Sequence, residues 1–268
     1  MPDLPHIHIC PTLDTLSRAM ALHLHEHITA TLGTQERYTL ALAGGSTPET
    51  LYRILSGTAG DADARDADGP DAGTHTDIPT DIPWERVHLF WGDERYVPHD
   101  HPKSNVRLAR ETLLRNAAVP EANVHPMPTN RPADEAAAAY TDTLQRFFAT
   151  PSGAPRTTFD AVLLGLGSDG HTASLFPENA PASYDAAWVR VVEAPPRHDV
   201  ATRLTCTLPV LNGATRAFFL VAGARKHDAL TGVLDRRDPA LPATHVQARS
   251  ATHWFTDRAA RFGNADST

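Results

Sequence analysis

Short β-prone segments alternate with helical ones along this 268-residue chain, and this alternation limits the fold more than any other feature. The strand-like runs lie at 38–43, 87–92, 159–164, 188–194, 202–208 and 216–222. Helical patterns separate most of them, as in the apolar spacing of Leu13, Leu16, Met20, Leu24 and Ile28. We therefore predict an α/β protein, with a three-layer, Rossmann-like arrangement around a mainly parallel central sheet. Because no linker or repeat is evident, we expect residues 1–268 to form one domain.

The segment 57–83 carries most of the negative charge of the chain. It holds seven aspartates and one arginine, and so −6 of the formal net charge of −8. Because it has few large apolar residues, we predict a disordered surface loop. The overall negative charge argues against nucleic acid or an anionic membrane as the main partner. The rest of the surface is close to neutral, which leaves room for a local cationic pocket.

The cysteines and the N-terminus indicate the cellular compartment. Cys10 and Cys206 have no CxxC spacing, so we interpret them as two reduced thiols. The start MPDLPHIHICPTLDTL has no basic segment before an apolar core, and no apolar run approaches the roughly 20 residues that span a bilayer. We predict a soluble, cytoplasmic protein.

Gly44, Gly45, Ser46 and Thr47 form the first candidate binding loop. They follow a strand-like run and precede a helix, where Thr47 could cap, Pro48 suits the first turn, and Ser46 with Glu49 has capping-box spacing. Free backbone N–H groups, two hydroxyls and a helix start would suit a phosphate. The G-K-[ST] spelling is absent, so a monophosphate fits better than a nucleoside triphosphate. An ordinary, well-capped turn is the alternative.

The stretch FDAVLLGLGSDGHTASLFP (159–177) contains G-x-G-x-x-G, the spelling of dinucleotide-binding loops. Such loops usually open a fold and lead into a long helix. Here the motif comes late, and Pro177 ends any helix that follows. We therefore predict that these glycines shape a turn that presents His171, and we expect no cofactor.

Five stretches, taken together, resemble one known family. They are LALAGGSTPETLYRIL, VHLFWGDERYVPHDHPKSNVRLARETLL, FDAVLLGLGSDGHTASLFP, TRLTCTLPVLN and GARKHDAL. In this order they are similar to the 6-phosphogluconolactonase family, which shares its fold with glucosamine-6-phosphate deaminases. Deaminases typically continue the G-x-G-x-D-G-H segment with an Ala-Phe-Asn-Glu-like run, whereas residues 172–177 here have the lactonase spelling. The resemblance implies hydrolysis of 6-phospho-D-glucono-1,5-lactone without metal or cofactor.

The resemblance also implies roles for individual residues. His171 would be the general base, because imidazole titrates near neutral pH, and Asp169 would orient it. Asp93 would accept hydrogen bonds from sugar hydroxyls, and Arg95 would bind the substrate or the developing oxyanion. Glu94 has no assigned role. The remaining candidates would hold the phosphate (Gly44, Gly45, Ser46, Thr47, Arg203, Lys226) or face the sugar (Ser104, Asn105), although Ser104 and Asn105 could simply cap a helix.

Two histidine-rich sequence motifs resemble metal sites, but we expect no metal at either. HLHEH (23–27) fits H-x-x-E-H, yet Leu24 and Ile28 on the same helix face the core and no third ligand is identifiable. HDH (99–101) lies between two prolines and is expected to be a loop. Two other functions remain open, an aminosugar-phosphate deaminase or isomerase and a non-catalytic sugar-phosphate sensor. We expect a monomer or a weak homodimer.

Overall fold

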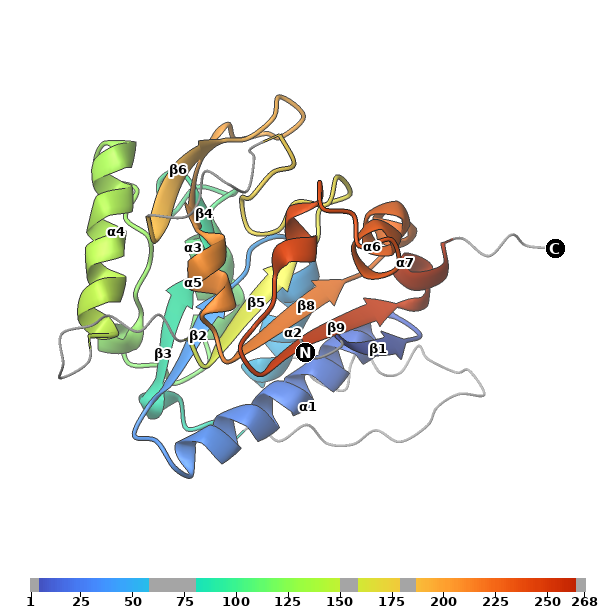
Figure 1. Ribbon diagram of the computed structural model, residues 1–268. Coiled ribbons are helices and arrows are strands. Elements are labelled where there is room, and N and C mark those ends of the chain that lie inside the picture. Colours follow the sequence, from blue (N-terminus) through green and yellow to red (C-terminus); the bar gives the residue numbers. More distant parts are fainter. Residues whose placement is uncertain (1–4, 58–80, 150–158, 179–186, 264–268) are drawn as a thin grey trace.

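A computed structural model describes residues 5–57, 81–149, 159–178 and 187–263. Its centre is a six-stranded sheet in the order β1-β9-β8-β5-β2-β3, in which every neighbouring pair is parallel (Figure 1). The strands are β1 (His6–Cys10), β2 (Tyr38–Leu42), β3 (Val87–Trp91), β5 (Ala161–Gly165), β8 (Arg216–Val221) and β9 (Ala251–Asp257). The predicted α/β fold with a mainly parallel sheet is confirmed.

The central strands are buried on both faces, as their continuous apolar sequences require. Every residue of β2 is buried, and in β8 only Arg216 is not. The edge strand β1 and its neighbour β9 were not predicted. Their sequences, HIHIC and ATHWFTD, interrupt the apolar pattern with polar residues. Local patterning therefore finds the four strands from β8 to β3 but not the two on the other side of the sheet.

The longest helix, α1 (Leu13–Leu32), buries the predicted stripe of Leu16, Met20, Leu24 and Ile28. It packs beside α2 (Thr47–Leu55) and contacts β1, β2 and β9. A reciprocal capping box between Thr12 and Thr15 begins α1. The other helices are α3 (Asn105–Ala109), continued by a π-helical turn (Arg110–Leu114), α4 (Ala133–Phe147), α5 (Leu208–Asn212), α6 (His227–Leu234) and α7 (Arg258–Phe262).

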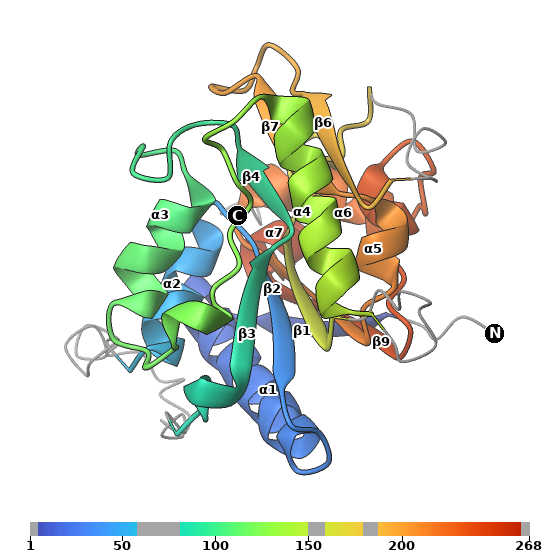
Figure 2. The ribbon, with the colours of Figure 1, turned by 90° about the vertical axis from the view of Figure 1, so that its left-hand side faces the viewer.

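A second, three-stranded sheet lies above the carboxyl ends of the parallel strands (Figure 2). It is antiparallel, in the order β4 (Asp93–Arg95), β7 (Thr202–Cys206) and β6 (Val189–Glu193), and α4 packs on it. The predicted strands at 188–194 and 202–208 exist, but they belong to this sheet and not to the parallel one. Gly92 joins the two sheets, because its N–H donates to Leu42 of β2 and its carbonyl accepts from Cys206 of β7.

The acidic loop predicted over 57–83 lies outside the described residues from 58 to 80. At its end, Ile82 is buried and belongs to the hydrophobic core, so the packed fold resumes before the predicted boundary. Within residues 5–57, 81–149, 159–178 and 187–263, no helix combines the length and apolar character that crossing a bilayer requires.

Candidate active site

A cavity of about 380 Å³ lies at the carboxyl ends of β2, β3, β5 and β8, where α/β proteins usually bind ligands. The predicted residues that line it are Gly44, Gly45, Ser46, Thr47, Asp93, Arg95, His171, Arg203 and Lys226. A neighbouring cavity shares Gly45, Ser46, Arg95 and Arg203 with it and is also lined by Ser104 and Asn105. Asp169 lines neither cavity and contacts His171 instead. The fold therefore gathers side chains that the sequence places up to 182 positions apart.

The loop after β2 differs from the predicted capping pattern. Ser46, not Thr47, is the residue before α2, and its side chain makes no cap hydrogen bond. Ser46 already has helical angles (φ −75°, ψ −25°), and Glu49 pairs with Arg53 instead of completing a capping box. Since its hydroxyl is not used to cap α2, Ser46 can serve a ligand in the cavity that it lines.

Two glycines of the G-x-G-x-x-G segment form the turn that carries His171. The Gly167 N–H donates to the His171 carbonyl at 2.8 Å, and the Gly170 N–H donates to the Gly167 carbonyl at 3.0 Å. Gly170 has φ +83°, which favours glycine, and a Cβ on Gly167 would lie 2.0 Å from His171 Nδ1. No helix follows in residues 171–178. The glycines thus shape a histidine-bearing turn, as predicted.

His171 is held by Asp169 on one side of its ring. Asp169 Oδ1 accepts from His171 Nδ1 at 2.6 Å and from the His171 backbone N–H at 3.2 Å. Burial alone would raise the pKa of Asp169, but hydrogen bonds from His171 and Arg197 hold that pKa well below its ordinary value. Asp169 is therefore a carboxylate at neutral pH and favours a proton on Nδ1, which leaves Nε2 free of Asp169.

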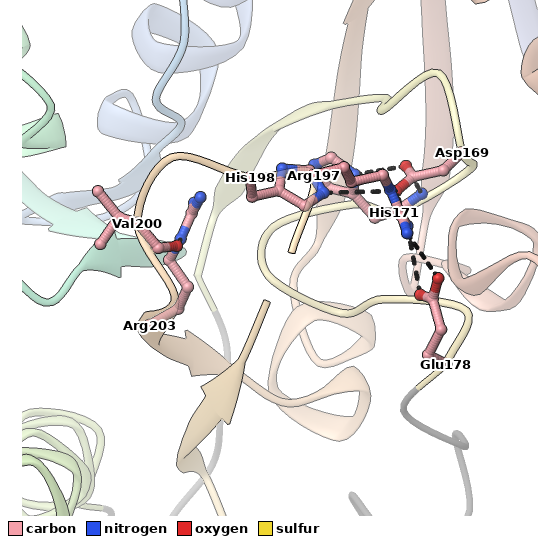
Figure 3. Close-up of polar contacts among 7 residues, drawn as sticks. All are labelled: Asp169, His171, Glu178, Arg197, His198, Val200 and Arg203. Carbon is pink, nitrogen blue, oxygen red and sulfur yellow. Dashed lines mark hydrogen bonds and ion pairs between the residues drawn. The ribbon is translucent and has the colours of Figure 1, made fainter. Parts of the chain in front are cut away.

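Three residues near this pair, Glu178, Arg197 and His198, were not predicted to belong to the site (Figure 3). Arg197 Nε donates to Asp169 Oδ2 at 3.0 Å, and its Nη1 donates to Glu178 Oε1 at 2.7 Å. The His198 ring lies edge-on to the His171 ring, with centroids 5.1 Å apart. Arg197 and His198 lie in the loop between β6 and β7. A charged cluster after Pro195 and Pro196 is visible in the sequence, but its position beside Asp169 depends on the small sheet.

Asp93 and Asn105 form a buried polar pair on the other side of the cavity. The Ser174 hydroxyl donates to Asp93 Oδ2 at 2.6 Å, and Asn105 Nδ2 donates to the Asp93 carbonyl at 2.9 Å. Asn105 Oδ1 is buried and has no partner among the described residues. It fills the space beside Gly44, where a Cβ would lie 1.8 Å away. An acceptor without a partner at this place suits a ligand hydroxyl.

Glu94, which had no predicted role, holds the start of α3. Its carboxyl accepts from the backbone N–H groups of Asn105 (2.8 Å) and Val106 (2.9 Å) and from the Ser104 hydroxyl (3.0 Å). Burial raises the pKa of Glu94 to about 7, although these backbone hydrogen bonds oppose the shift. The Ser104 hydroxyl also accepts from the Arg107 N–H and so caps α3, which was the alternative to its expected place beside the sugar. Glu94 therefore fixes the segment that carries Ser104 and Asn105.

Four cations line the cavity: Arg95, Arg203, Arg225 and Lys226. Arg95 and Arg203 are cross-strand partners of β4 and β7, and Lys226 precedes α6. Arg203 Nε donates to the Val200 carbonyl at 2.9 Å. Burial, followed by the charge of Arg95, lowers the pKa of Arg203, and burial lowers the pKa of Lys226. Two like charges directly opposite each other destabilise a sheet, so an anion bound between them would relieve the repulsion.

Within the described part of the chain, one group of side chains has the ligand atoms for a metal ion. Asp169, His171 and His198 offer ligand atoms within 4.8 Å of one another. A divalent cation there would have to displace Arg197, which occupies Asp169 Oδ2. In HLHEH, His23 Nδ1 contacts the Ala19 carbonyl and His27 Nδ1 contacts the Tyr38 hydroxyl. In HDH, His99 Nε2 contacts the Met127 carbonyl. These last histidines are used within the fold.

The fold and this geometry define an α/β protein with a cationic, histidine-containing site for a small ligand. The model of the family "Glucosamine-6-phosphate isomerases/6-phosphogluconolactonase" matches residues 11–254. The chain belongs to this family.

Individual relatives agree with that assignment. A 6-phosphogluconolactonase of Synechocystis sp. is 40% identical over 236 residues, covering 87% of this chain and 87% of that protein. One of Mycobacterium tuberculosis is 34% identical over 258 residues, covering 94% and 95%. The crystal structure of the Thermotoga maritima 6-phosphogluconolactonase matches with a TM-score of 0.75 and 28% identity, covering 95% of this chain and 100% of that one. A monomeric glucosamine-6-phosphate deaminase, 18% identical with a TM-score of 0.74 and covering 95% and 98%, shares the fold.

Proposed function

We propose that this protein hydrolyses 6-phospho-D-glucono-1,5-lactone to 6-phospho-D-gluconate. The observation that carries the proposal is His171, which lines a cavity shared with Arg203, Lys226 and the glycine loop while Asp169 holds its Nδ1. A general base and a phosphate-binding set are the two parts that hydrolysis of a phosphorylated lactone needs. The names of the relatives at 30–40% identity support this substrate over an aminosugar phosphate.

The phosphate would bind to Gly44–Thr47, Arg203 and Lys226. These groups offer backbone N–H donors, hydroxyls and two cations around one cavity. Asp93 and Asn105 would accept hydrogen bonds from the sugar hydroxyls, and Ser104 would stand beside them in the neighbouring cavity. Arg95 lines both cavities and would face the carbonyl oxygen.

The reaction then follows from the hydrogen bonds of His171. A water molecule attacks C1 while His171 Nε2 takes its proton, and the carbonyl oxygen becomes an oxyanion stabilised by Arg95. When this intermediate collapses, the bond between C1 and the ring oxygen breaks. The ring oxygen takes the proton back from His171, so lactone and water give the hydroxy acid with no other reactant. Asp169 stabilises the imidazolium that forms between the two steps.

The test is hydrolysis of freshly generated lactone, with the uncatalysed rate subtracted. We expect the native protein to accelerate it and His171→Ala to lose about 100-fold or more of kcat, the usual contribution of a general base. His245→Ala is the control, because the His245 ring contacts the Pro239 carbonyl and the residue lines neither cavity. Full activity in His171→Ala would remove the base assignment but keep the lactonase.

Different assay results would indicate one of the two alternative functions, an aminosugar-phosphate deaminase or a sugar-phosphate sensor. Release of ammonia from glucosamine 6-phosphate, with no effect on the lactone, would indicate a deaminase. Binding of 6-phosphogluconate without turnover of either compound would indicate a sensor. We further propose that one domain carries this activity, because both sheets line the same cavity. The cytoplasmic location and the monomeric or weakly dimeric state remain predictions.

A further inference from the structure

Arg197 binds the carboxylate of the His171–Asp169 pair at the oxygen that His171 does not use. Its Nε and Nη2 both donate to Asp169 Oδ2, while Asp169 Oδ1 accepts from His171. The two carboxylate oxygens are thus bound to different partners, which fixes the rotation of the carboxyl group. Figure 3 shows the guanidinium between Asp169 and Glu178.

Arg197 is itself held on two sides. Its Nη1 and Nη2 donate to Glu178 Oε1 (2.7 Å) and Oε2 (3.3 Å), a bidentate pair that orients the planar guanidinium. Glu178 ends the described part of the segment that begins with the His171 turn. Arg197 therefore ties the loop between β6 and β7 to both ends of the segment 169–178.

The next residue reinforces this arrangement. His198 packs edge-on against the His171 ring and lies 4.9 Å from the Phe176 ring centroid. Its Nε2 lies 3.5 Å from Asp169 Oδ2, the same oxygen that Arg197 occupies. The loop between β6 and β7 thus forms one wall of the pocket in which the His171 ring is held.

We propose that Arg197 is a positioning residue that acts through Asp169 to keep His171 in one orientation and one tautomer, with the proton on Nδ1 and Nε2 toward the substrate. The proposal rests on the proposed function, in which His171 is the base. An exposed ion pair contributes little to stability, and Arg197 is 44% exposed in its side chain. Its expected effect is therefore on the reaction and not on folding.

A second role for Arg197 must be separated from this one. Arg197 also lines the neighbouring cavity and could bind the substrate directly. If Arg197 binds the substrate directly, its replacement should mainly raise KM, because the bound substrate would lose a contact with a cation. If Arg197 positions His171, its replacement should mainly lower kcat, because a misplaced base stabilises the transition state less.

The experiment compares native protein with Arg197→Met, Arg197→Lys and His171→Ala in lactone hydrolysis. We expect Arg197→Met to lose about 10- to 100-fold in kcat, the range that small misplacements cost, with KM nearly unchanged. Arg197→Lys keeps the positive charge but loses the planar guanidinium that binds two acceptors at once. Its kcat should therefore lie between those of Arg197→Met and native protein. Arg261→Met is the control, because Arg261 makes a bidentate pair with Asp235 at 2.7 and 3.0 Å outside both cavities.

A spectroscopic measurement keeps this test independent of turnover. Nitrogen-15 NMR of labelled histidine should show His171 protonated on Nδ1 in native protein and mixed tautomers in Arg197→Met. Native kcat and an unchanged His171 tautomer in Arg197→Met would overturn the positioning role, as would a change in KM alone. Full activity in His171→Ala would instead show that His171 is not the base. Arg197 would then have no role in the reaction through Asp169 and His171. If native protein does not accelerate hydrolysis, the proposed function fails, and the tautomer alone decides whether Arg197 orients His171.

Discussion

The two sheets of this protein supply different parts of the candidate site. The parallel sheet presents the Gly44–Thr47 loop, the His171 turn and Lys226 at the carboxyl ends of its strands. The antiparallel sheet supplies Arg95 and Arg203 from paired strands, and Arg197 from the loop between β6 and β7. The base and the backbone N–H groups therefore depend on one set of strands, and most of the guanidinium groups on another. Each part can be changed separately.

The largest effect is expected where the parallel sheet presents its histidine. Gly167→Ala places a Cβ 2.0 Å from His171 Nδ1 and 2.4 Å from Asp169 Oδ1, so the pair cannot keep its geometry. We expect kcat for the lactone to fall by about 100-fold, as for other misplaced catalytic groups. Gly33→Ala is the control, because Gly33 follows α1 with φ −65°, lines neither cavity, and a Cβ there would lie 3.2 Å from the Ala30 carbonyl. Equal activity in both variants would contradict the proposed role of the turn.

The next effect is expected at the junction of the two sheets. Glu94→Ala leaves three backbone N–H groups and the Ser104 hydroxyl without their buried acceptor. We expect the free energy of unfolding to fall by roughly 3 kcal/mol, measured by urea denaturation. Substrate affinity should fall with it, since Asn105 is placed by the same hydrogen bonds. The exposed Glu121→Ala should change neither quantity, and a stable Glu94→Ala would show that Glu94 does not anchor α3.

A smaller effect separates the cations of the two sheets. Arg203→Met and Lys226→Met should each raise KM by about tenfold, because each removes one charge-assisted contact to the phosphate. Since both side chains would contact the same phosphate, their effects in a double variant should deviate from additivity. Arg110→Met, at an exposed position, is the control. A rise in KM for only one of the two would place the phosphate on that sheet alone.

The smallest effect concerns acid stability at the β1–β9 edge of the parallel sheet. His253 packs among His6, His8 and His23, and burial followed by these neighbours lowers its pKa to about 3. Arg216 adds to the shift. A histidine whose pKa is lower in the folded chain contributes stability that is full above about pH 6.5, the ordinary value, and lost as the pH falls toward 3.

We therefore expect His253→Phe to reduce the loss of stability between pH 7.5 and pH 5. The difference from native protein should be about 1–2 kcal/mol, measured as free energies of unfolding at both pH values. His101→Phe, at an exposed position, should behave like native protein. If His253→Phe loses as much stability on acidification as native protein does, the histidine cluster is not the acid-sensitive part of this edge.

Local patterns in the sequence were sufficient for the middle of the parallel sheet and for the helix that covers it. The run YTLALA became β2 and the stripe from Leu16 to Ile28 became the buried face of α1, because each is defined by neighbours along the chain. The same patterns did not find β4, which has three residues. They also did not show that β6 and β7 leave the main sheet, because strand pairing depends on hydrogen bonds between distant segments.

The residues of the candidate site also fall into two groups, those that the sequence indicated and those that only the structure showed. The family resemblance indicated His171, Asp169 and the glycine loop, and these residues do lie together. It did not indicate Arg197, Glu178 or Glu94, whose contacts join segments that are distant in sequence. The expected capping by Thr47 also failed, because the angles of Ser46 already belong to the helix.

The sequence by itself determined the α/β class, the central strands and the presence of a histidine-bearing glycine turn, because these depend on periodicity and on the conformational freedom of glycine. Tertiary structure alone decided that β4, β6 and β7 form a second sheet across the carboxyl ends of the first. That sheet sets Arg95 opposite Arg203 and brings Arg197 to Asp169. The physical reason is that charge and hydrogen bonding act across space, so side chains from different strands acquire their chemistry only when the strands have paired.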